Sequence, residues 1–118
     1  MKIIESTRSF TPEEVYHLTK DPQIDKLSKH AGELLEITGI IVYEDQDADG
    51  ETRTVVSFEL TEGAAIASNS ATVMRSVHDI LDIYEATGTE VPWPLSIVVI
   101  QDKSSKSGRT YYNIALAK

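Results

Sequence analysis

The chain has 118 residues, of which 41% are hydrophobic and 25% are charged. These values are ordinary for one soluble domain, and no apolar run approaches the roughly 18 residues that a membrane span needs. The absence of cysteine excludes disulfides, thiolate metal sites and cysteine nucleophiles. The N-terminal segment MKIIESTRSF lacks the apolar region and cleavage site of a signal peptide, so we expect a cytoplasmic protein.

The formal net charge of −8 is distributed unevenly along the chain. Residues 44–51 contain five acids and no base, whereas residues 103–118 contain four bases and no acid. An acidic protein repels nucleic acid at long range, but a local basic segment can still bind it. The simpler interpretation of both runs is that they are solvated loops.

The first 32 residues predict a short helical extension. Thr11, Pro12 and Glu14 form the start signal of a helix, with Thr11 and Glu14 in the positions of a capping box. This helix should end before Asp21-Pro22, because the residue before a proline avoids helical backbone. A second short helix is predicted over residues 23–30.

Residues 33–118 predict a β-rich domain around one long helix. Alternation and apolar runs indicate strands at 33–43, 52–60, 64–68, 95–101 and 109–116, with a helix at 70–86 between the third and fourth. Gly39 in the first strand is predicted to mark a bulge or bend. The order β-β-β-α-β-β is that of an OB-fold, a small partly open barrel. We therefore predict a single β-rich α+β domain, in which a five-stranded OB-like barrel (33–118) follows the helical extension (1–32).

The helix at 70–86 carries the clearest amphipathic pattern in the chain. Its apolar residues recur at helical spacing, so they should pack on one end of the barrel. They are Val73, Val77, Ile80, Leu81 and Tyr84.

The segment YEDQDADGET (43–52) has acids on the spacing of a calcium loop. A complete loop starting at Asp45 would need a bidentate acid at its twelfth position, which is Val56. The flanks also have strand-like rather than helical patterns, so we interpret the segment as a charged hairpin turn. No nucleophile elbow or phosphate-binding glycine loop is present, and we predict no catalytic residue, no metal site and no cofactor.

A binding surface is the remaining functional hypothesis. The turn KSSKSGR (103–109) has three cations suited to following a phosphate backbone, Lys103, Lys106 and Arg109. Strand alternation places Tyr111 on the same face as Arg109, where its ring could stack on a base. Further candidates at strand ends are Tyr43, Arg53 and Trp93. For each aromatic residue the alternative is packing in the core.

A family resemblance supports this hypothesis. The segments TRSFTPEEVYHLTKDP, YEDQDADGE, SNSATVMRSVHDILDI and SSKSGRTYYNI, in this order, resemble small single-stranded DNA-binding proteins of phages and mobile elements of Gram-positive bacteria. The resemblance covers most of the chain. It implies an OB-type domain that coats single-stranded DNA in replication or recombination without sequence preference.

The sequence therefore predicts a non-enzymatic, sequence-independent single-stranded DNA-binding protein. Replication or recombination proteins are further candidate partners, an oligomer is an open alternative, and a membrane is not expected. On this hypothesis the acidic segment at 44–51 repels the DNA, so neutralising Asp45, Asp47 and Asp49 should tighten binding. Two alternatives remain at this point: a β-barrel protein-interaction module in which that acidic segment docks a basic partner, and a barrel that binds a small ligand or ion.

Overall fold

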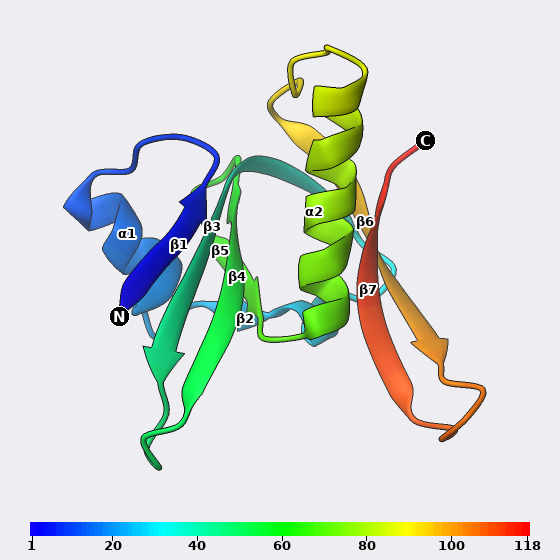
Figure 1. Ribbon diagram of the computed structural model, residues 1–118, viewed down its shortest axis with the longest axis horizontal. Helices are drawn as coiled ribbons and strands as arrows, with labels where there is room; N and C mark the ends of the chain where they lie inside the picture. The colour runs from blue at the N-terminus through cyan, green and yellow to red at the C-terminus, as the bar shows by residue number, and fades with distance from the viewer.

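The computed structural model describes residues 1–118, which form a curled sheet with two α-helices (Figure 1). In chain order the elements are β1 (Lys2–Ser6), α1 (Pro12–Thr19), β2 (Asp25–Lys26), the 3-10 helix η1 (Leu27–His30), β3 (Leu34–Gln46), β4 (Thr52–Leu60), β5 (Ala65–Ser68), α2 (Ala71–Ala86), β6 (Leu95–Lys103) and β7 (Thr110–Leu116).

The sheet has the strand order β2-β5-β4-β3-β6-β7, and β1 pairs with β3. All pairings are antiparallel except that of β2 with β5. The predicted order β-β-β-α-β-β is present as β3-β4-β5-α2-β6-β7, so the fold is roughly OB-like. The prediction of five strands is wrong, however: the sheet has seven, and it curls into a half-barrel in which β7 pairs with β6 alone.

α2, rather than a further strand, flanks β7 (Figure 1). The side-chain oxygen of Asn113 accepts a hydrogen bond from the backbone N–H of Ile114 at 2.8 Å. The same oxygen accepts one from the hydroxyl of Ser76 on α2 at 2.7 Å. Asn113 therefore ties β7 to α2, which holds this side of the half-barrel together without strand pairing.

β3 is the long, bent strand that joins the two halves of the sheet. One edge pairs with β4, while the other pairs with β6 over residues 34–37 and with β1 over residues 41–44. The β3–β4 register shifts between Ile37 and Gly39, which confirms the predicted bulge. A side chain at Gly39 would crowd the ring of Phe10, because a Cβ there would lie 3.0 Å from Phe10 Cζ. This close approach explains why the bend carries a glycine.

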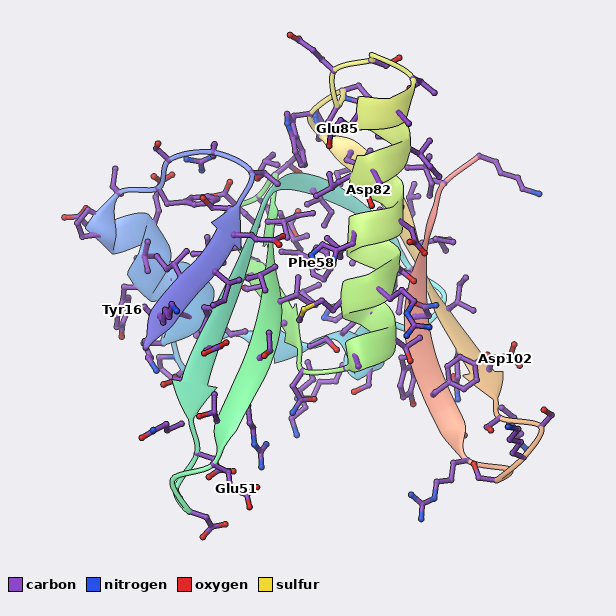
Figure 2. The ribbon with its side chains drawn as sticks, viewed as in Figure 1. Tyr16, Glu51, Phe58, Asp82, Glu85 and Asp102 are labelled. Carbon is purple, nitrogen blue, oxygen red and sulfur yellow. The ribbon has the colours of Figure 1, made fainter.

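The core lies between the concave face of the sheet and α2. Phe58 of β4 is fully buried between that strand and the helix (Figure 2). The predicted face of α2 packs there: Val73 and Val77 are buried, and Ile80, Leu81 and Tyr84 contact the same cluster. The hydroxyl of Ser70 accepts a hydrogen bond from the N–H of Val73 and caps the helix.

The N-terminal extension agrees with the prediction only in part. α1 begins with the predicted capping box and packs on the convex face of the sheet over a second, smaller core. Of the predicted helix at 23–30, only residues 27–30 are helical, as the 3-10 helix η1, and residues 25–26 form β2 instead. The reason is that Ile24 packs against the smaller core whereas Leu27 is buried in the main one, so the chain crosses from one core to the other. β1 was not predicted; all five of its residues are exposed, which leaves no burial pattern to detect.

Candidate nucleic-acid interface

Two hairpins project from the same side of the molecule, the lower side in Figure 1. One is the β3–β4 turn (residues 47–51) and the other is the β6–β7 turn (residues 104–109). Gly50 and Gly108 have φ of +79° and +69° in these turns, a conformation that residues with a Cβ rarely adopt. The first hairpin is acidic and the second is basic, so the two sides of this region have opposite charge.

A groove of about 600 Å³ lies beside the parts of β4 and β7 that adjoin these hairpins and reaches the N-terminal end of α2. β4 and β7 form two of its walls, and the remaining lining residues come from β2, η1, the end of β5 and the two residues before α2. The lining residues are Lys26, Leu27, Ser28, Arg53, Val55, Ala67, Ser68, Asn69, Ser70, Tyr111 and Tyr112. The residues that line the groove thus include two tyrosines, two cations and several small polar residues.

Tyr111 and Arg53 are the predicted residues that the groove brings together. Tyr111 is 39% exposed, so its ring is open to a ligand. Arg53 lies 58 residues earlier in the chain, on β4, and the sequence did not indicate that it shares a site with Tyr111. The sequence also missed Lys26 and Tyr112. No local pattern identifies them, because they meet only when β2 and β7 approach the same groove.

Lys103, Lys106 and Arg109 are exposed in the β6–β7 hairpin that borders the groove. The turn is closed by a hydrogen bond from the N–H of Ser104 to the carbonyl of Arg109 at 2.9 Å. None of the three cations makes an ion pair, in contrast to Arg8, Lys20 and Arg53. Their charge is therefore not neutralised by a neighbouring carboxylate.

Tyr43 and Trp93 lie outside the groove. Tyr43 is 5% exposed, and its hydroxyl donates a hydrogen bond to the carbonyl of Thr19 on α1. Packing in the core, the alternative that the sequence left open, is therefore what the structure shows for Tyr43. Trp93 is 38% exposed but precedes β6, at the end of that strand opposite the basic hairpin. Neither residue lines the groove.

The segment at 43–52 forms the predicted charged hairpin turn. One carboxylate oxygen of Asp47 accepts the N–H groups of Asp49 and Glu51, at 2.9 and 3.0 Å, and the other accepts Arg53 Nε at 3.0 Å. The hydrogen bond from Glu51, aided by those from Asp49 and Arg53, holds the pKa of Asp47 below its usual range. Asp45 pairs instead with Lys20, the residue that follows α1, and Glu51 lies near the hairpin tip (Figure 2). The structure contains no group of three or more acidic or histidine side chains arranged to hold a metal ion.

The comparison with known families shows to which family the chain belongs. The family model described as "Phage Single-stranded DNA-binding protein" matches residues 22–117. The chain belongs to this family. Membership supports a single-stranded DNA-binding role, and the matched region contains every residue of the groove and both hairpins. No curated protein and no solved structure gave a match.

Two further observations bear on this family member. β1 and α1 lie outside the matched region, which begins just before β2. In addition, no helix of the structure has the length and apolar character needed to cross a membrane.

Proposed function

We propose that this member of the family coats single-stranded DNA without sequence preference, and that it does so in phage or mobile-element DNA replication or recombination. The groove between the hairpins is the proposed binding site. The observation that carries the proposal is that two cations and two tyrosines line one groove within the region shared with the family, while the adjoining β6–β7 hairpin carries three cations without ion pairs.

The cations supply the electrostatic part of the proposed interface. Lys103, Lys106 and Arg109 are exposed in the β6–β7 hairpin, which leads into the groove-lining part of β7, and Lys26 and Arg53 line the groove itself. Neutralising a phosphate releases a condensed counterion, which favours binding at low salt. Because phosphates repeat regularly along any strand, these contacts carry no information about sequence.

The tyrosines supply the second part. Tyr111 and Tyr112 are neighbours on β7, and both line the groove. Stacking of a base on an aromatic ring contributes about 1–3 kcal/mol and tolerates any base, because every base has a π-face. A site made of phosphate-binding cations and stacking rings should therefore bind single strands of any sequence and exclude duplex, whose bases are already stacked.

The experiment that tests the proposal is a fluorescence anisotropy titration of the wild-type protein. The probes are labelled oligo-dT, a mixed-sequence oligonucleotide of equal length, and the corresponding duplex. We expect similar affinities for both single strands, weaker binding of the duplex, and loss of affinity with added salt. Absence of oligo-dT binding at about 20 mM salt, where such contacts are strongest, would overturn the proposal. The protein-interaction hypothesis would then take its place.

A further inference from the structure

An acidic residue lies at the edge of the proposed DNA groove and contacts one of its cations. Arg53 Nε donates a hydrogen bond to Asp47 Oδ2 at 3.0 Å, across the base of the β3–β4 hairpin. The side chain of Arg53 is 56% exposed and that of Asp47 is 16% exposed. By charge alone, Asp47 should oppose DNA binding, as was inferred from the sequence for the whole acidic hairpin. Its contacts suggest a different role.

The hairpin holds the Asp47 carboxylate in place. Two backbone N–H groups of the turn bind Oδ1, and the backbone of Asp47 is itself tied to Glu51 and Gly50 by hydrogen bonds of 2.9 and 3.0 Å. The side chain therefore has little freedom to move away from Arg53. Asp49 differs from it, because the carboxylate of Asp49 makes no hydrogen bond or ion pair within the chain.

Asp47 occupies a single donor of the guanidinium group. A guanidinium has five N–H donors, and the contact uses the one on Nε. Neither terminal nitrogen of Arg53 makes a hydrogen bond within the chain. These two nitrogens form the fork that binds two oxygens of a phosphate at once. An arginine held through Nε retains this fork and loses less side-chain freedom when the phosphate binds.

We propose that Asp47 is a positioning residue that holds Arg53 at the groove wall with its terminal nitrogens available to a phosphate of single-stranded DNA. The inference rests on the proposed function and deepens it. It assigns opposite effects to neighbouring acids of one hairpin: Asp47 favours binding through Arg53, whereas Asp49 acts on the DNA by repulsion alone.

The test compares Asp47→Asn with the matched control Asp49→Asn in titrations of the full chain with oligo-dT. Both variants remove one negative charge, and asparagine keeps a carbonyl oxygen for the turn at position 47. We expect Asp47→Asn to weaken binding about three- to tenfold, because a hydrogen bond that orders the phosphate contact is lost. Asp49→Asn should tighten binding, by less than about twofold at moderate salt.

The role of Arg53 is isolated by a double-mutant cycle. In an Arg53→Ala background, Asp47→Asn should no longer weaken binding, because Asp47 then has no arginine to position. Asp47→Asn alone should also make the plot of log K against log salt shallower by up to about 0.7, the value for one contact on a single strand. Arg53→Lys should bind nearly as weakly as Arg53→Ala, because a lysine bound to Asp47 has no fork to offer.

Each outcome decides between the alternatives. If Asp47→Asn tightened oligo-dT binding as much as Asp49→Asn does, the positioning role alone would be overturned. The same conclusion would follow if Asp47→Asn still weakened binding in the Arg53→Ala background. Full affinity of Arg53→Lys would overturn it too, and this result does not depend on whether Asp47→Asn folds. Failure of the wild type to bind oligo-dT would instead overturn the proposed function, and the positioning role with it.

Discussion

At the scale of single residues, the proposed interface contains two kinds of contact that a salt titration separates. Lys103 and Lys106 act through charge, so replacing both with alanine should flatten the slope of log K against log salt by about 1.4. Tyr111 acts through stacking, so Tyr111→Ala should cost about 1–3 kcal/mol of binding free energy and leave the slope unchanged. The measurement is oligo-dT affinity at four or more salt concentrations.

Matched substitutions control for charge and for ring loss. Lys2→Ala with Lys118→Ala removes the same two charges from positions outside the groove and its hairpins, and should leave the slope nearly intact. Tyr111→Phe retains the ring and should retain most of the affinity. Equal slope changes for both lysine pairs would contradict a localised phosphate contact, because they would report net charge alone.

His30 predicts how stability depends on pH. Its ring nitrogens lie 3.1 Å from carboxylate oxygens of Glu33 and Asp25, and the side chain is 20% exposed. The hydrogen bond to Glu33, aided by Asp25, raises the pKa of His30 against the opposing effect of burial. A raised folded-state pKa stabilises the protein below the unfolded value of about 6.5, and this stabilisation is lost as the pH rises through the folded-state value.

We therefore expect the free energy of unfolding to decline as the pH rises above about 6.5, the unfolded value, and His30→Gln to reduce that decline. Urea denaturation at several pH values measures it. The lowered pKa values of Asp21, Asp45 and Asp47 act in another window, since the stability that they contribute is lost as the pH falls below about 4. A profile that is unchanged by His30→Gln would show that the two carboxylates do not stabilise the charged imidazole.

The tyrosines show what sequence reasoning can reach at this scale. Alternation along β7 correctly left Tyr111 exposed, because a strand pattern is local. The same reasoning could not decide the position of Tyr43, since its burial depends on α1, a segment that begins 31 residues earlier and packs across β3. That burial is also the main cause of the raised pKa of Tyr43. For this reason, the sequence does not decide whether a residue is buried when its burial depends on non-local packing.

At the scale of elements, α2 packs against both halves of the sheet, which β3 joins. It lies between β4 and β7 in Figure 1, and Val77 is 2% exposed in its buried face. Val77→Ala should reduce the free energy of unfolding by about 2 kcal/mol, from lost burial and the cavity that remains. Chemical denaturation followed by circular dichroism measures this change.

Ile83 provides the control within the same helix, because it is 61% exposed. Ile83→Ala should change the free energy of unfolding by no more than about 0.5 kcal/mol. Similar losses for the two substitutions would mean that the apolar face of α2 has been assigned incorrectly.

Elements with a strong local signal were predicted well, and elements without one were not. α1 and α2 both have a capping residue and helical periodicity, and each lies within one residue of its predicted bounds. β1 and β2 have no such local signal. β1 consists of five exposed residues and β2 of only two, and they are held in place by pairing with β3 and β5, respectively. The groove depends on β2 and η1, which is why its cation Lys26 was missed.

At the scale of the whole molecule, the charge distribution reconciles a net charge of −8 with a DNA-binding family. The acids of the β3–β4 hairpin and the cations of the β6–β7 hairpin lie at separate tips on one side of the molecule (Figure 1). Most of the surface should therefore repel a DNA strand and direct it to the basic hairpin, and added salt should screen this effect.

The position of β1 and α1 completes this arrangement. These elements precede the region shared with the family, and α1 packs over the smaller core on the convex face of the sheet. None of their residues lines the groove between the hairpins. We therefore expect them to stabilise the fold without contacting DNA.

The central claim is that single-stranded DNA lies in the groove between the two hairpins. The most direct test is an amide NMR titration of the ¹⁵N-labelled wild-type protein with oligo-dT. We predict that chemical-shift changes concentrate at residues 26–28, 53–55, 67–70 and 103–112, while residues 2–6 and 12–19 change little. Shift changes centred on β1 and α1, with the groove residues unchanged, would contradict it.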